Sequence, residues 1–221
     1  MGNMQETKIV LPTPGQLLTP GVTLLLVLAG AGFLGLTFFR DAALDLLGLT
    51  PQGILHGRVW QLVTYPFLNG AWGLVFNGVI IVFVGSAIER EWRTASLLWL
   101  WLAVTVGCGV LWVLVNLILG RPTVGFGAGA GAFGFIAVMG VLFRGRRFLV
   151  FVTTIEGQHL ALGLIAIGII LSLPAPVNLV WVVGALIGYL YVKARWSLGA
   201  RGSIRHNPRQ SGGRGQFVDV D

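Results

Sequence analysis

The chain has 221 residues, of which 55% are hydrophobic and 10% charged, and its formal net charge is +7. Soluble domains carry about 25% charged residues, so this composition excludes an ordinary soluble protein and indicates one that lies in a bilayer. We expect no nucleic-acid partner, because the excess of basic residues follows the loops of a membrane topology.

Six apolar segments predict six transmembrane helices and an all-α polytopic membrane protein. Crossing a hydrocarbon core takes about 20 helical residues; three segments approach or exceed that length and three are shorter. In chain order they are Gly21–Phe39, Trp72–Ile88, Ala95–Leu119, Pro122–Phe143, Leu160–Leu173 and Val177–Val192. A buried core helix explains a short segment taken alone, but six in one chain favour a membrane bundle. The first segment lacks a signal-peptide cleavage site and is expected to be retained.

The segments define one membrane domain, residues 16–196. Residues 1–15 form a short N-terminal segment, and residues 197–221, rich in Gly, Arg and Ser, predict a basic disordered tail. Twelve of the 15 Lys and Arg residues lie in ends and loops assigned to one side. The positive-inside rule then places both termini in the cytoplasm. We expect a multi-pass integral protein of a prokaryotic plasma membrane, with the bilayer itself as a partner.

Two connections are unusual. Arg40–Ala71 is long and partly apolar, which is typical of a loop in the membrane interface. Arg144–Gln158 begins with arginines and continues with an apolar run, so we expect it to anchor at the cytoplasmic interface.

Two polar residues mark the second segment. Asn77 is costly in a membrane unless it faces other helices and forms hydrogen bonds there. Glu89 lies at the cytoplasmic end and can accept hydrogen bonds from backbone groups of a neighbouring segment. We expect a structural role for both.

A glycine-rich run marks the fourth segment. Gly129 to Gly134 satisfies G-x-G-x-x-G, but a dinucleotide site needs a preceding strand and a following acidic residue, and both are missing. The run, with Gly131 and Gly134, instead predicts a surface against which another helix backbone packs closely. In the last segment, Gly184 and Gly188 predict a second such surface, with Trp181 on the same side of the helix and therefore pointing into the bundle.

In this order the motifs resemble the rhomboid family of intramembrane serine proteases. The stretch Gly57–Phe67 looks like the approach to that family's second helix; a span ending Gly-x-x-x-Glu, a glycine-rich fourth helix and a last helix with Gly184 and Gly188 follow. The resemblance implies a six-transmembrane-helix rhomboid-like bundle over about residues 16 to 195.

The resemblance also implies that the active-site positions are degenerate. Active members have G-x-S-x-G at the start of the fourth helix; here the run Gly127-Ala-Gly129-Ala-Gly131 places Gly129 at the nucleophile. Trp181 stands at the catalytic histidine. Gly73 stands at the second histidine, which helps to hold the oxyanion, whereas Asn77 matches the family residue.

The three histidines, His56, His159 and His206, lie away from this expected site. Without an activated nucleophile, covalent acyl transfer has no route. We therefore predict that the chain is not an enzyme and has no catalytic residue, cofactor or metal. We also hypothesise that Trp181 fills the former active-site cavity beside Gly129.

The predicted function is that of a rhomboid-like pseudoprotease that binds transmembrane segments of other membrane proteins without cleaving them. Two alternatives remain open: an active rhomboid-type protease with displaced catalytic residues, and a non-catalytic membrane scaffold. The client proteins and the oligomeric state are not predicted.

Overall fold

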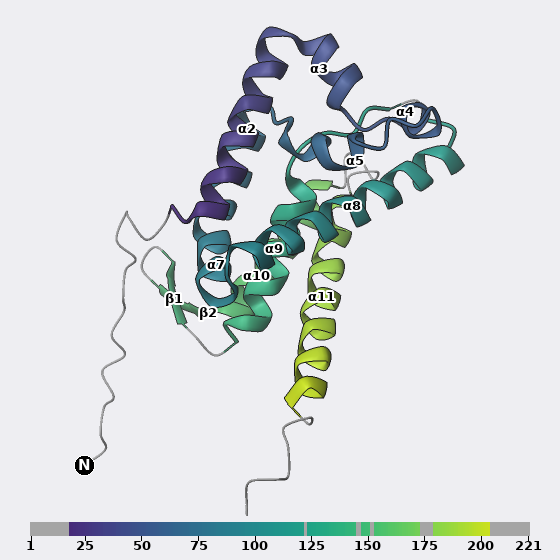
Figure 1. Cartoon of the computed structure of the whole chain (residues 1–221). Helices are drawn as coiled ribbons and strands as arrows, with labels where there is room; N and C mark the ends of the chain where they lie inside the picture. The colour runs from purple at the N-terminus through teal and green to yellow at the C-terminus, as the bar shows by residue number, and fades with distance from the viewer. Residues whose placement is uncertain (1–17, 122, 145–146, 151–152, 173–178, 204–221) are drawn as a thin grey trace, which may run out of the picture.

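The computed structural model describes residues 18–121, 123–144, 147–150, 153–172 and 179–203, which fold into a helical bundle with one short β-hairpin (Figure 1). The long elements are α2 (Pro20–Phe38), the stretch α6 (Ala71–Ile80), η2 (Ile81–Gly85) and α7 (Ser86–Trp92), α8 (Thr94–Ile118), α9 (Gly129–Leu142), α10 (Gly157–Ser172) and α11 (Leu179–Ser203). The short elements are α3 (Arg40–Leu47), α4 (Pro51–Leu55), α5 (Gln61–Thr64), η1 (Tyr65–Phe67), β1 (Arg147–Val150) and β2 (Thr153–Glu156).

Each predicted apolar segment contains a helix, so the predicted all-α rhomboid-like bundle is confirmed. Among the described residues, Pro20–Phe38, Ala71–Trp92 and Thr94–Ile118 are long and apolar enough to span a membrane, and Gly129–Leu142 and Gly157–Ile170 are shorter apolar helices. The chain is an integral membrane protein.

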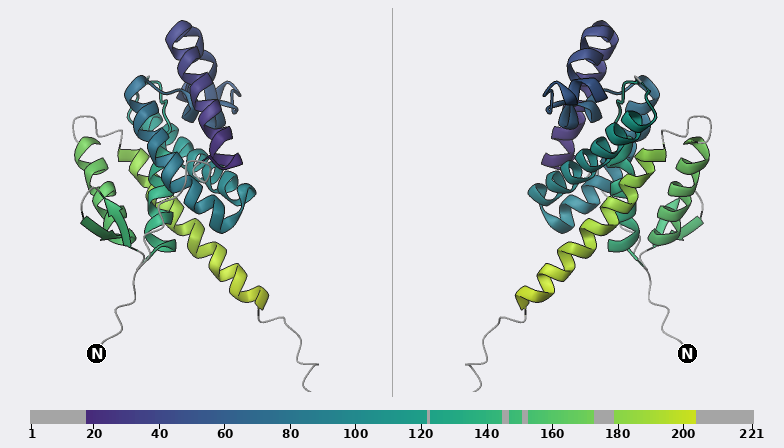
Figure 2. Two further views of the ribbon diagram at one scale, coloured as in Figure 1. Left: turned by 90° about the vertical axis from the view of Figure 1, so that its left-hand side faces the viewer. Right: turned by 90° about the vertical axis from the view of Figure 1, so that its right-hand side faces the viewer.

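Helix α9 is the centre of the bundle. It packs against α8, α10 and α11, and nine of its 14 residues are buried. A helix that is apolar on all sides needs such a position. In both views of Figure 2, α10 and the hairpin lie on one side of the molecule and α2 on the other.

Small residues bring α9 and α11 close together. A Cβ atom placed on Gly184 would overlap the backbone of Ala130, and one placed on Gly188 would lie 2.6 Å from the carbonyl oxygen of Gly134. The glycine-rich surfaces predicted on the fourth and last segments therefore face each other. Close backbone approach of this kind is how helices associate in lipid, where burial of apolar surface gives no driving force.

Glu89 joins three helices at one end of the bundle. Its buried carboxylate accepts hydrogen bonds from the backbone N–H groups of Gly21 at 2.8 Å and Val22 at 3.0 Å. The hydroxyls of Thr19 and Thr94 also donate to it. A negative charge at the N-terminus of α2 satisfies free N–H donors and complements the helix dipole.

Replacing Glu89 with Gln is expected to lower the free energy of unfolding by about 2 kcal/mol, because one acceptor oxygen becomes a donor facing other donors. Reversible unfolding in mixed detergent micelles, followed by tryptophan fluorescence, measures this change. The control is Glu91→Gln, which removes the same charge from an exposed side chain. Equal effects of the two substitutions would show that the cap contributes nothing specific.

Two predicted boundaries were wrong, and one loop contains a hairpin that was not predicted. Pro122–Phe143 is not one helix, because α9 begins only at Gly129, after a proline and two glycines. The segment 144–158 contains an antiparallel hairpin in which Arg147 pairs with Glu156 and Val150 with Thr153. Helix α11 continues to Ser203, so the predicted disordered tail begins with helical residues. The N-terminal segment 1–15 and residues 204–221 lie outside the described residues.

Candidate functional site

The short length of α9 indicates that the loop before it lies at membrane depth. A 14-residue helix is about 21 Å long, which is shorter than the hydrocarbon core of about 30 Å. Irregular backbone at that depth is tolerated only where it is buried in protein or lines a cavity, because its polar groups find no partner in lipid. The hydrogen bonds of residues 123–128 therefore decide how this region is built.

The loop is bonded to the connection between α2 and α6. Leu49 and Gly125 exchange two backbone hydrogen bonds of 2.8 Å, and the N–H of Gly127 donates to the carbonyl of Tyr65 at 3.0 Å. Gly127 has φ +109°, a conformation that favours glycine. The Tyr65 hydroxyl donates to the carbonyl of Thr105 at 2.8 Å.

Asn69 is the hub of the site. Its buried side-chain carbonyl Oδ1 accepts hydrogen bonds from the N–H of Ala128 at 3.1 Å and from Nδ2 of Asn77 at 3.2 Å. Its own Nδ2 donates to the carbonyls of Pro66 at 3.0 Å and Phe67 at 3.3 Å. One side chain thus connects the end of η1, the helix α6 and the turn that starts α9.

Three of the predicted site residues surround this hub. Asn77 bonds to Asn69 directly, whereas Gly73 and Gly127 offer only backbone. A Cβ atom on Gly73 would lie 3.5 Å from Asn69 Oδ1, and one on Gly127 would lie 3.9 Å from it. A side chain at position 73 or 127 would therefore enter the site.

The other two predicted positions lie on α9 and α11. Gly129 is the first residue of α9 and follows Ala128, whose N–H bonds to the hub. Trp181 is in α11, three residues before Gly184. The Trp181 side chain lies outside the described residues, so the hypothesis that it fills the former cavity stays a prediction.

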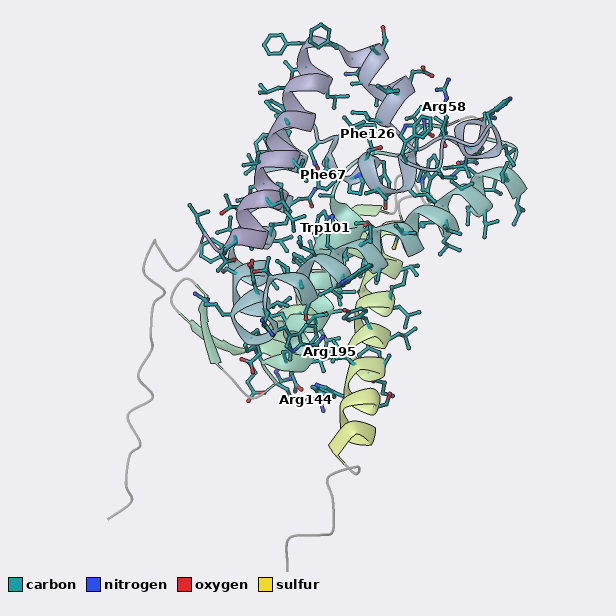
Figure 3. The ribbon with its side chains drawn as sticks, viewed as in Figure 1. Arg58, Phe67, Trp101, Phe126, Arg144 and Arg195 are labelled. Atoms are coloured by element: carbon teal, nitrogen blue, oxygen red, sulfur yellow. The ribbon has the colours of Figure 1, made fainter. Side chains whose placement is uncertain are left out.

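Aromatic rings form the wall behind Gly131. The ring of Trp101 occupies the space that a Gly131 side chain would take, and it packs at 6.3 Å from Phe67 and 5.4 Å from Phe135 (Figure 3). Trp101 Nε1 is buried without a hydrogen-bond partner in the described part of the chain. The interior beside the site is therefore predominantly apolar and closely packed.

The groups bonded to Asn69 are neutral amides. His56 lies at the end of α4, with its Nδ1 2.7 Å from the carbonyl of Gln52, and His159 lies beside Glu156 at 3.6 Å. His206 lies outside the described residues. Among the described residues no group of His, Cys, Asp and Glu is arranged to hold a metal ion. The part of this arrangement that the structure describes can donate and accept hydrogen bonds but contains no acid–base pair at Asn69.

Asn69 was missed by the sequence analysis. It lies outside the apolar segments, in an Asn-Gly pair typical of turns. A polar residue between the apolar stretch that ends at Phe67 and the start of α6 could have indicated this role, because an amide at membrane depth needs hydrogen-bond partners.

The comparison with known protein families gives a match. A family model described as Rhomboid domain matches residues 56–198, which is more than half of the chain. No curated protein matches the chain.

Proposed function

Because the chain belongs to the rhomboid family, we propose that it is a rhomboid-like pseudoprotease, which binds transmembrane helices of other membrane proteins without cleaving them. The first support is the sequence at the family's active-site positions: Gly129 replaces the nucleophile and Trp181 the base. A glycine supplies no atom that could attack a carbonyl carbon, so the acyl-enzyme route is closed.

The observation that carries the proposal is the hydrogen bonding of Asn69. In serine proteases the developing oxyanion is stabilised by preorganised donors that point to the position of the charge. Here the donor of Asn77 and the backbone N–H before Gly129 both bond to Asn69 Oδ1. Because the side-chain oxygen of Asn69 accepts hydrogen bonds from both donors, the arrangement favours a stable structure over catalysis.

A client helix needs an apolar surface next to this site. On the stretch from α6 to η2, the side chains of Trp72, Phe76, Val79 and Phe83 are exposed at spacings of three and four residues, which places them on one helix face. Gly73 and Asn77, each one residue further along, turn toward Asn69. We propose that a client helix packs against this face, with α9 behind it.

We also propose how the protein is oriented in the membrane. Arg144 and Arg195 lie at one end of the bundle and Arg58 at the opposite end (Figure 3). Arg195 stacks on Trp92 near the turn between α7 and α8. With Arg90 in the last turn of α7 and Arg93 between the two helices, the basic end is the cytoplasmic one, in the plasma membrane of a prokaryote.

The test is photo-crosslinking from position 76 in vesicles that contain a panel of single-span proteins, each tagged at both ends. We expect capture of at least one client with both tags present, because binding leaves the peptide bond intact. The control places the photoreactive residue at Val27 of α2, which is also exposed.

The outcomes distinguish a binder of client helices from a scaffold and from an active protease. Capture from position 76 alone supports a binder. Equal or no capture from both positions would favour a scaffold without a client surface, and capture of a fragment carrying one tag would show an active protease.

A further inference from the structure

A groove lies between α9, α10 and α11, away from the Asn69 site. Its volume is about 330 Å³, and its apolar walls include Ala137, Val141, Ile165 and Leu186. Volumes of this order are typical of small-molecule sites. Leu186 is exposed at the rim, so the groove opens on the surface that faces lipid.

Three of the described residues that line the groove are polar. They are Arg144, Gln158 and Tyr189, and Arg144 Nε donates to Gln158 Oε1 at 3.0 Å, which orients the guanidinium. Lys193 Nζ lies over the Tyr189 ring, 5.4 Å from its centroid. One cation therefore lines the groove, and a second lies against a residue that lines it.

Among the residues that the structure describes, no acidic side chain lines the groove. On the elements packed against it, the carboxylate of Glu156 lies 3.6 Å from His159 Nδ1. The groove beside Arg144 therefore has a positive potential that an anion can complement.

We propose that this groove binds a phospholipid with an anionic headgroup. The acyl chain lies along the apolar walls, and the phosphate lies between Arg144 and Lys193. A guanidinium matches phosphate oxygens with paired donors, and basic pockets between helices at the cytoplasmic end bind anionic headgroups. The site uses α9 to α11 rather than the exposed face of α6, and it does not depend on the loss of catalysis.

To test this, the purified, delipidated protein is titrated with phosphatidylglycerol or with phosphatidylcholine of the same acyl chains. Lipid binding is followed by native mass spectrometry. We expect the first phosphatidylglycerol to bind about tenfold more tightly than phosphatidylcholine. Arg144→Gln with Lys193→Gln should abolish this difference. Arg40→Gln with Arg121→Gln, the same charge change at the other end, should preserve it.

A second experiment fills the groove with a larger side chain. Leu186→Trp should weaken phosphatidylglycerol binding about tenfold, whereas Leu114→Trp, on the exposed face of α8, should not. A melting temperature for each variant confirms that it is folded. Equal binding of the two lipids by the unsubstituted protein, or equal effects of a variant and its control, would overturn the proposal. Displacement of the lipid by glycerol phosphate would identify an anion site that needs no acyl chain, and would overturn it as well.

Discussion

Replacing Asn69 with Ala is expected to lower the free energy of unfolding by about 3 kcal/mol. The substitution leaves the N–H of Ala128 and the carbonyls of Pro66 and Phe67 without the partner they have now. Each buried polar group left unpaired costs about 1 to 3 kcal/mol, and water does not readily replace the side chain at membrane depth. Reversible unfolding of the purified protein in mixed micelles measures the loss.

A double-mutant cycle with Asn77→Ala tests whether the two amides act together. Asn77 is only partly buried and donates one hydrogen bond to Asn69, so its replacement alone should cost about 1 kcal/mol. The double variant should be scarcely less stable than Asn69→Ala, because the first substitution already removes the shared bond. Additive losses, or a loss of less than 1 kcal/mol for Asn69→Ala, would contradict the assignment of Asn69 as the hub.

Replacing Gly188 with Ala is expected to cost about 3 kcal/mol or to prevent folding. The new Cβ atom would lie 2.6 Å from the carbonyl oxygen of Gly134 and 2.9 Å from its Cα. These are backbone atoms of a central helix, so no side-chain rotation relieves the overlap and α9 and α11 must separate. Overpacking costs about 1 to 3 kcal/mol and occasionally more.

Gly163→Ala is the matched control for this substitution. Gly163 is also in a helix, α10, but among the described residues no atom outside its own turn of helix lies within 4 Å of the position its Cβ would take. Alanine there should be neutral or stabilise by up to about 1 kcal/mol, because it favours helix. If both variants unfold at the same denaturant concentration, the close contact between α9 and α11 does not hold the bundle together.

The helices could be predicted from the sequence because they depend on local pattern. Runs without charges located every membrane segment, and the four-residue spacing of Gly184 and Gly188 predicted the side on which α11 packs. These features need no knowledge of distant contacts.

The start of α9 and the role of Asn69 could not be predicted in this way. Hydropathy extends through residues 122–128, but residues 123–128 follow the positive φ of Gly127 and hydrogen bonds to Leu49 and Tyr65, which are distant in sequence. Asn69 acquires its partners only when α6 and α9 are packed. Of the predicted site, Gly73, Asn77 and Gly127 come together around a residue that no motif had identified.

The loss of chemistry at this site is the central claim, and a fluorophosphonate probe tests it most directly. The purified protein is treated in detergent beside an active rhomboid protease and a Gly129→Ser variant. We predict labelling of the active protease only: the native chain has no serine between Ser96 and Ser172, and a serine at position 129 would have no histidine to activate it. Labelling of a serine in the native chain, blocked by denaturation, would contradict the account.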